Sequence, residues 1–217
     1  MILANAVVDF FIKGGPIMYP TAAVAIVAVC LIAERIFWWV RTMRGRNSRR
    51  LDEVFAALAA GGMDRSITLS AGSSDPVIRM LHHGLQHPNT SMQGALEVAA
   101  GQELRGAGRF LSGMDTIVTL GPLLGLLGTV TGIMGSFTSI GGSELAVEKV
   151  TGGIGEALIA TAAGLGIAIV TLIPMNHFHT RLSSLQFDLE TAATNALILA
   201  ARHGFDKAAG VSAQASA

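Results

Sequence analysis

Apolar residues gather in three long segments of the chain, each bounded by charged or glycine-rich sequence. The segments run from residue 16 to 40, from 114 to 140 and from 150 to 176. A helix rises about 1.5 Å per residue, so roughly 20 apolar residues suffice to cross a bilayer. The pattern predicts an all-α membrane protein with three transmembrane helices, two of which extend into a cytoplasmic helical bundle.

The composition fits this class, because 51% of the residues are apolar, only 14% are charged and 26 are glycine. Acidic and basic residues balance at 15 each, so the net charge indicates no particular partner. Cys30 is the single cysteine, which excludes an intramolecular disulfide and a cysteine metal cluster. The first span ends in Glu34 and Arg35 followed by two tryptophans, an order typical of an uncleaved membrane helix at its interface.

Positive charge is concentrated between the first and second spans. Residues 41–113 contain nine arginines and six acidic residues. By contrast, Lys13 is the only basic residue in 1–15, and Lys149 is the only basic residue in 141–149. Because cytoplasmic loops carry the excess of Lys and Arg, we predict that residues 41–113 are cytoplasmic. Residues 1–15 are then an interfacial segment on the outer side, and residues 141–149 form an outer loop. The cluster RTMRGRNSRR is interpreted as an orientation signal or a contact for anionic membrane lipid, rather than a nucleic-acid site.

Helical patterns continue in the predicted cytoplasmic part. Short helices are expected at 51–60 and 76–86, separated by Gly- and Ser-rich breaks, and a longer helix is expected to run from Ser91 into the second span without interruption. One histidine cluster is present, at His82, His83 and His87. No cysteine or acid stands at ligand spacing beside it, so a solvated helix face is favoured over a metal site.

The helical period also continues beyond the third span, through residues 177–205. Apolar residues recur there at alternating steps of four and three: Phe178, Leu182, Leu185, Leu189, Ala192, Ala196 and Leu199. Such a seam is typical of packed helices, so it predicts a cytoplasmic helical bundle or self-association. Gly204 is the expected end of this helix, and residues 206–217 are predicted to be a disordered tail.

Glu156 is the one ionisable residue in the third apolar segment. A carboxylate there has an insertion cost of about 2.5–3.5 kcal/mol on the translocon scale, so we expect it to face a bundle interior or a wet cavity. A functional role is favoured over two alternatives, an interhelical hydrogen bond and a side chain that reaches the headgroups. The last is weakened by its distance from Lys149, about 9 Å along the axis.

Small and hydroxylated residues form a stripe along the second span, at steps of three and four: Pro122, Gly125, Thr129, Gly132 and Ser136. Such a stripe permits close helix approach, and its hydroxyls either bond a neighbouring helix or line a hydrophilic path. Thr129, near the middle of the span, is the favoured candidate for a polar role.

The face of Glu156 on the third span contains mostly small residues: Gly152, Ile159, Ala160, Ala163 and Ile167. This face leaves room for another helix or for water. Thr161 lies five positions after Glu156, about 140° around a straight helix. A path that uses both residues must therefore pass between helices.

Motifs for common enzyme chemistry are absent from the sequence. It contains no G-x-x-x-x-G-K-[ST], no H-E-x-x-H and no G-x-S-x-G. We therefore predict a protein that is not an enzyme and holds no cofactor, and that draws energy from an ion gradient, most simply of protons. A carboxylate between two aqueous sides suits this, because it alternates between protonated and charged forms as its surroundings change.

Three motifs resemble the MotA/TolQ/ExbB proton-channel family, and its ExbB members most of all. They are GGPIMYP at 14–20, GPLLGLLGTVTGIMGSF at 121–137 and GIGEALIATAAGLGIAI at 153–169. The resemblance covers all three spans in order. It implies that Glu156 binds or gates the proton and that Thr129 and Thr161 are the polar residues of the proton path.

The resemblance also implies a location and partners. It implies a multi-pass protein of the Gram-negative inner membrane, with a periplasmic amino terminus and a cytoplasmic carboxyl terminus. It implies a homo-oligomeric ring, typically a pentamer, around the single spans of an ExbD- or TolR-like partner with a membrane aspartate. Proton flow would then drive movement that is passed to a TonB-like protein.

Two alternatives stay open at this point. One is a TolQ-like subunit of the Tol-Pal envelope system, and the other is a non-conducting membrane scaffold in which Glu156 only bonds helices together. A flagellar stator fits less well, because those proteins have four spans. Residue types alone do not separate TonB from Tol service or protons from sodium.

Overall fold

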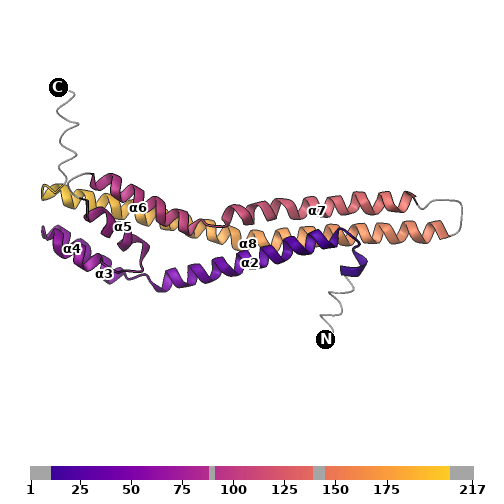
Figure 1. Cartoon of the computed structure of the whole chain (residues 1–217), viewed down its shortest axis with the longest axis horizontal. Coiled ribbons are helices and arrows are strands. Elements are labelled where there is room, and N and C mark those ends of the chain that lie inside the picture. Colours follow the sequence, from indigo (N-terminus) through magenta and orange to yellow (C-terminus); the bar gives the residue numbers. More distant parts are fainter. Residues whose placement is uncertain (1–10, 88–90, 139–144, 206–217) are drawn as a thin grey trace, which may run out of the picture. The chain divides into compact units, whose positions relative to one another are not determined.

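The computed structural model describes residues 11–87, 91–138 and 145–205, with side chains from residue 150 on in the last range. These residues form helices joined by short turns, and no strand occurs among them. In chain order the helices are α2 (Met18–Arg44), α3 (Ser48–Ala59), α4 (Met63–Ser70), α5 (Pro76–Leu85), α6 (Met92–Ala107), α7 (Leu111–Thr138) and α8 (Leu145–Arg202) (Figure 1). The predicted tail at 206–217 and residues 141–144 of the predicted outer loop lie outside the described residues.

Within the described residues, three stretches of helix are long and apolar enough to cross a membrane, and they lie in α2, α7 and α8. The prediction of an all-α chain with three membrane helices is confirmed. The chain divides into two compact units. The membrane unit contains the described residues up to Arg35 together with Phe110–Phe178, and the second unit contains Ile36–Arg109 and the described residues from His179 on.

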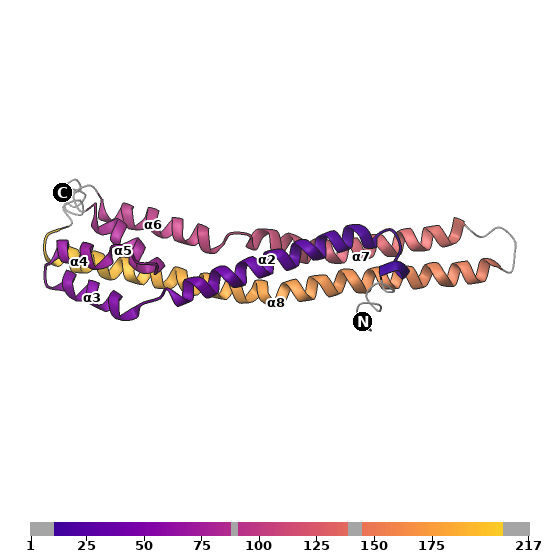
Figure 2. The same ribbon diagram turned by 60° about the horizontal axis from the view of Figure 1, so that its bottom comes forward.

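In the membrane unit, α2 runs beside α8, and α7 packs closely against α8 (Figures 1 and 2). A Cβ atom added at Gly121 would lie 2.8 Å from the carbonyl oxygen of Gly164, and one added at Gly125 would lie 3.0 Å from the Cα atom of Thr161. Real Cβ atoms essentially never show the first distance, and the second is tighter than nine in ten real Cβ contacts. Glycine at these positions therefore sets the short distance between the two helices.

The contact stripe of α7 is centred differently from the predicted one. Gly121 and Gly128 are buried in the contact, while Pro122 and Thr129 are half-buried beside it. The predicted stripe members Gly125, Gly132 and Ser136 do face α8; on α8, Ala160 is buried and Ala163 is half-buried. One position along a helix turns the side chain by about 100°, so the true contact can lie one residue away from a predicted stripe.

The predicted continuous helix from Ser91 into the second span is wrong in its middle. α6 ends at Ala107 and α7 begins at Leu111, and between them Phe110 has a φ of 66°. A bulky residue in the left-handed region cannot continue a right-handed helix. Gly106 and Gly108, which have low helix propensity, precede the break. The boundary between the two units falls at the same place, between Arg109 and Phe110.

α8 continues through Pro174 as a single helix of 58 residues. The predicted segments at 150–176 and 177–205 therefore share one helix as far as Arg202. In the second unit, the seam that the sequence predicted on this helix is buried at Leu185, Leu189, Ala192 and Ala196, each 5% exposed or less.

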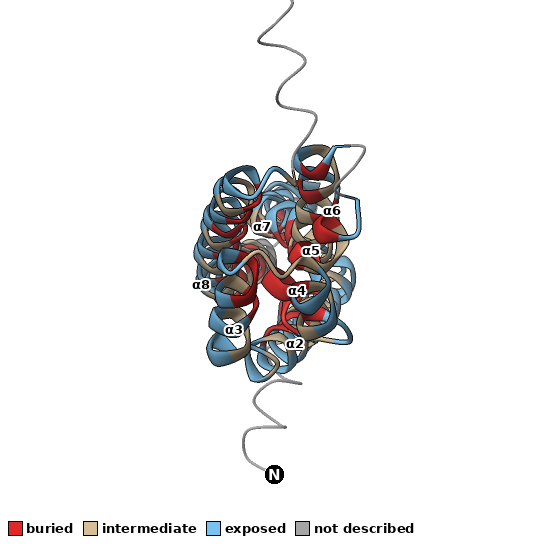
Figure 3. Ribbon diagram, turned by 90° about the vertical axis from the view of Figure 1, so that its left-hand side faces the viewer, coloured by how far each residue is buried: buried red, intermediate tan, exposed pale blue. Residues whose placement is uncertain are grey.

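Side-chain caps define the short helices of the second unit. The side chain of Asn47 accepts a hydrogen bond from the backbone N–H of Arg50 at 3.0 Å, and that of Asp75 accepts one from Val77 at 3.0 Å. Figure 3 shows the buried faces of these short helices. The fully buried core includes Val54, Leu58, Ile78, Met80, Leu81, Leu85 and Leu96.

α4 occupies a segment that was predicted to be a Gly- and Ser-rich break. Its serines are buried, and their hydroxyls are satisfied by carbonyl oxygens: Ser66 bonds Gly62 at 3.0 Å and Ser70 bonds Ile67 at 2.9 Å. Such local bonds let a polar segment form a helix with buried serines, which apolar periodicity alone does not indicate.

Candidate functional site

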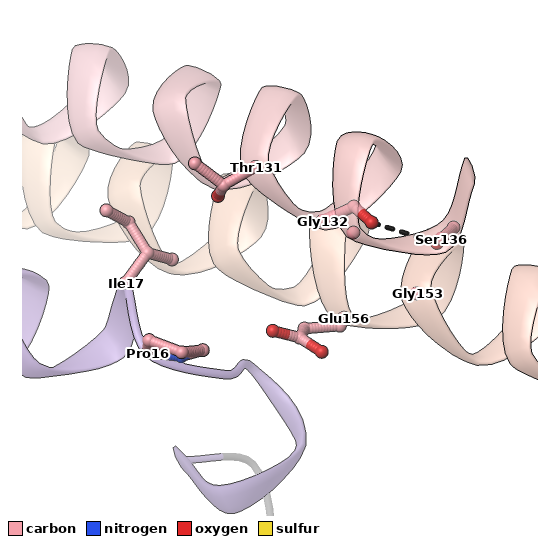
Figure 4. A pocket seen from close by; sticks show the side chains of 8 residues that line it. Pro16, Ile17, Thr131, Gly132, Ser136, Gly153 and Glu156 are labelled. Carbon is pink, nitrogen blue, oxygen red and sulfur yellow. Dashed lines mark hydrogen bonds between the residues drawn. The ribbon is translucent and has the colours of Figure 1, made fainter. Parts of the chain in front are cut away.

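Glu156 projects into a cavity of about 530 Å³ in the membrane unit (Figure 4). The wall is built from the turn that precedes α2 and from facing parts of α7 and α8. The lining residues are Pro16, Ile17, Thr131, Gly132, Gly135, Ser136, Gly153 and Glu156. Among these eight residues, Glu156 alone is ionisable, and it is half-buried.

Small residues make the cavity. Gly132 and Gly135 on α7 and Gly153 on α8 contribute no side chain, so space remains where two spans would otherwise fill it. A Cβ atom at Gly132 would lie 3.0 Å from the Cβ atom of Ala157, which shows how close the helices come at the edge of the cavity. Gly132 and Gly153 thus allow close packing of the two helices, while a Cβ atom at Gly135 would meet no atom within 4 Å.

Two hydroxyl groups of α7 lie at the cavity. Thr131 donates to the carbonyl oxygen of Leu127 at 2.9 Å, and Ser136 donates to that of Gly132 at 2.8 Å. Because each hydroxyl hydrogen is used within the helix, the oxygen lone pairs remain as acceptors. The hydroxyl oxygens and the carboxylate therefore suit a cation, a protonated water or a protonated carboxyl group.

The carboxylate of Glu156 lies against the backbone of Gly15, in the turn before α2. Gly15 has a φ of +69°, and a Cβ atom added there would overlap Oε1 and Cδ of Glu156 and lie 2.9 Å from its Cγ. The carboxylate makes no hydrogen bond or ion pair with any described residue. Among the described residues, packing rather than a polar partner therefore fixes its position.

The structure does not bring the two predicted pathway threonines into this cavity. Thr161 donates a hydrogen bond to the carbonyl oxygen of Gly125 at 2.9 Å, across the contact between α7 and α8. Thr129 donates to Leu126 at 2.6 Å within its own helix turn. Sequence reasoning missed Thr131, although its spacing of four residues from Gly135 could have placed both on one face of α7.

The charged pair at the other end of the first span is separate from the cavity. Arg35 is 1% exposed and donates to the carboxylate of Glu34 at 2.6 Å and 2.8 Å. Its guanidinium carbon lies 5.6 Å from the ring centroid of Phe110. A paired guanidinium against an aromatic ring is stabilised by both neighbours. Asp115, on α7, is exposed and does not line the cavity.

The histidine cluster of the second unit has local hydrogen-bond partners. Nδ1 of His82 lies 2.9 Å from the hydroxyl of Ser70, and Nδ1 of His87 lies 2.9 Å from the carbonyl oxygen of His83. His82 and His83 are half-buried, so the predicted solvated face is only partly exposed. In the described part of the chain, no three His, Cys, Asp or Glu residues lie close enough to hold a metal ion.

The fold and the site together define a multi-pass helical membrane protein with an acidic residue in a cavity between its spans. The sequence model of the MotA/TolQ/ExbB proton channel family matches residues 73–191, more than half of the chain, and the chain belongs to this family. Glu156 and Thr131 lie inside the matched part, whereas α2 and the turn before it lie outside. Membership gives the chain a general proton-channel role.

Two proteins of Synechocystis sp. are similar over most of the chain. The biopolymer transport protein named ExbB-like 3 is 35% identical over 200 residues, which cover 89% of this chain and 94% of that protein. The one named ExbB-like 1 is 34% identical over 178 residues, which cover 76% of this chain and 67% of that protein. The predicted similarity to the family, and to its ExbB members, is confirmed.

Proposed function

We propose that the chain is the proton-channel subunit of an inner-membrane motor that couples the proton gradient to TonB-dependent transport across the outer membrane. One observation carries the proposal: Glu156 stands in a cavity between spans, beside hydroxyl oxygens and without a polar partner among the described residues. A carboxylate in that setting can take up and release a proton without breaking a structural bond.

The chemistry of the cavity supports proton transfer. Protonation neutralises Glu156, and loss of the proton leaves a charge that is costly in an apolar span. Each elementary charge that crosses 100 mV corresponds to about 2.3 kcal/mol, so several coupled protons can drive conformational work. Water held by the hydroxyl oxygens of Thr131 and Ser136 would connect the carboxylate to the aqueous side.

A ring of copies around a single-span partner forms part of the proposal. Large apolar side chains of α8 that include Leu158, Ile169 and Ile173 are exposed in the single chain. They suit membrane lipid and neighbouring copies. A partner aspartate of the ExbD type would exchange the proton with Glu156, and a TonB-like protein would receive the movement.

The test replaces Glu156 in the native host. It measures three quantities together: gradient-dependent uptake of a substrate across the outer membrane (called uptake below), protein level and ring assembly. Glu156→Gln keeps the shape and removes titration, so uptake is expected to fall to the level of a deletion strain while the ring persists. Glu156→Asp keeps a titratable group and should retain part of the uptake. Asp115→Asn, which removes an exposed carboxylate outside the cavity, should leave uptake unchanged.

The same strains decide between the proposal and its alternatives. Normal uptake in Glu156→Gln with an intact ring would contradict the proposal and favour a scaffold. A deletion strain with normal uptake but high sensitivity to detergent would favour Tol-Pal service. The scaffold alternative has its own support in the close glycine contacts of α7 and α8.

A further inference from the structure

The turn that precedes α2 touches the carboxylate at the centre of the proposed function. We propose that Gly15 is a positioning residue for Glu156 and that the turn at Gly15 and Pro16 closes the ion cavity on that side. The proposal rests on the proposed function of Glu156. Gly15 and Pro16 lie outside the part of the chain that the family model matches.

The backbone of the turn is fixed by local bonds. The N–H of Gly14 donates to the carbonyl oxygen of Phe11 at 3.3 Å, and the N–H of Met18 donates to that of Gly15 at 3.1 Å. Gly15 has a φ of +69°, which favours glycine, and Pro16 follows with its ring-restricted φ. The turn is therefore defined by its own sequence.

The turn is also held between the other two spans. A Cβ atom at Gly128 of α7 would lie 2.9 Å from Cγ2 of Ile17, and one at Gly14 would lie 3.1 Å from Cγ2 of Ile159 on α8. These contacts place Ile17 against α7 and Gly14 against α8. Figure 4 shows the carboxylate of Glu156 on the side of the cavity where Pro16 lies.

Residue 15 is glycine for a steric as well as a conformational reason. Any side chain there would overlap the end of the Glu156 side chain, and no described polar group holds the carboxylate in another way. The turn therefore determines where the carboxylate lies in the cavity. Displacement of a reacting group by about 1 Å can reduce a rate by about a hundredfold, so this contact controls proton exchange.

A double-mutant cycle in the full-length protein tests the contact. Gly15→Ala and Glu156→Asp are made singly and together in the native host, and uptake is measured per amount of membrane-inserted protein. Aspartate is one methylene shorter, about 1.5 Å, so it removes the overlap with Oε1, and rotation of its carboxylate about the Cβ–Cγ bond reduces the overlap that remains. The backbone strain of alanine at residue 15 is the same in both backgrounds, so it cancels in the cycle.

Gly15→Ala alone should lower uptake by about tenfold or more. The double variant should recover to about the level of Glu156→Asp. Gly14→Ala is the matched control, because its Cβ atom would meet Met18 and Ile159 and not Glu156. In the double variant Gly14→Ala with Glu156→Asp, the fold-change in uptake should equal the product of the two single fold-changes. If the double variant Gly15→Ala with Glu156→Asp also shows the product of its two single fold-changes, the proposal is overturned.

If Gly15→Ala reduces protein level, the level itself becomes the measurement. Glu156→Gln has the size of glutamate and keeps the overlap, so only Glu156→Asp should restore the level in combination with Gly15→Ala. Restoration by neither substitution, or by both equally, overturns the proposal. Lost uptake in Glu156→Gln without coupling to residue 15 would refute this inference alone, whereas retained uptake in Glu156→Gln would refute the proposed function.

Discussion

The hydroxyl oxygen of Thr161 lies 2.9 Å from the carbonyl oxygen of Gly125, and the bond it donates joins α8 to α7. The bond forms where a Cβ atom on Gly125 would lie only 3.2 Å from the carbonyl oxygen of Thr161. A backbone carbonyl inside a helix has a second lone pair that can accept such a bond. Thr161 therefore has a structural role in the single chain, whatever it contributes to ion flow.

Replacement of Thr161 by valine should destabilise the membrane unit. Valine has a similar shape but no hydroxyl, so the interhelical bond is lost at a cost of about 0.6–1.7 kcal/mol. Thr161→Ser keeps the bond and serves as the control. Thermal unfolding of the purified protein in detergent measures the difference. Equal stability of the valine and serine variants would contradict the role assigned here.

Gly164 and Gly166 form a matched pair on α8. A Cβ atom at Gly164 would overlap the carbonyl oxygen of Gly121, whereas one at Gly166 meets no atom within 4 Å in the chain. Gly164→Ala should therefore separate the helices at a cost of about 1–3 kcal/mol. Gly166→Ala should cost nothing and adds helix propensity. The measurement is the stability of the two variants in detergent. A Gly166→Ala variant less stable than Gly164→Ala would contradict the packing described here.

Substitutions at Thr129 and Thr131 distinguish the proton path expected from the sequence from the one that the structure suggests. The family resemblance assigns a polar role to Thr129, but Thr131 is the threonine that lines the cavity of Glu156. Loss of one hydrogen-bonding group costs about 1 kcal/mol, so Thr131→Val should lower uptake about fivefold. Thr129→Val should have a smaller effect. If Thr129→Val impairs uptake and Thr131→Val does not, the sequence-based assignment of Thr129 to the proton path is supported instead.

The Arg79–Glu103 pair should stabilise the second unit at all moderate pH values. Nε and Nη2 of Arg79 donate to the two carboxylate oxygens of Glu103 at 2.8 Å and 2.5 Å. This hydrogen bond raises the pKa of Arg79, although burial opposes the shift. A raised pKa of a cationic group means that its contribution to stability is present at neutral pH and is lost as the pH rises through the range in which arginine titrates.

Arg79→Ala should therefore reduce stability by about 0.5–1 kcal/mol, a small value because Arg79 is 46% exposed. Arg79→Lys keeps the charge but cannot form the two-pronged bond, so it should recover only part of the loss. Urea unfolding at low and high salt measures both variants. A loss that stays the same in high salt would argue against an ionic contribution.

Local properties explain what sequence reasoning could predict of the fold. Apolar length identified the three spans, and the alternating seam on α8 identified Leu185 and Leu189 as buried. The break at Phe110 was missed, because the preceding residues retain a helical pattern and the left-handed conformation of a phenylalanine is not visible in it. α4 was missed because buried serines do not produce apolar periodicity.

Glu156 was identified by sequence alone, since a single carboxylate in an apolar span is costly wherever it points. Its surroundings depend on how each helix is rotated about its axis. Thr129 and Thr131 are two positions apart, about 200° around the helix, so the rotation of α7 decides which of them lies at the cavity.

The sequence by itself determined the all-α membrane class, the family and the acidic residue, because apolar length, motif and charge are properties of continuous segments. Only the tertiary structure decided which groups surround that residue. Gly15 lies 141 positions before Glu156 in the chain, and no local sequence pattern links the two. Their contact arises because the turn before α2 packs between α7 and α8, and that packing is a property of the folded chain.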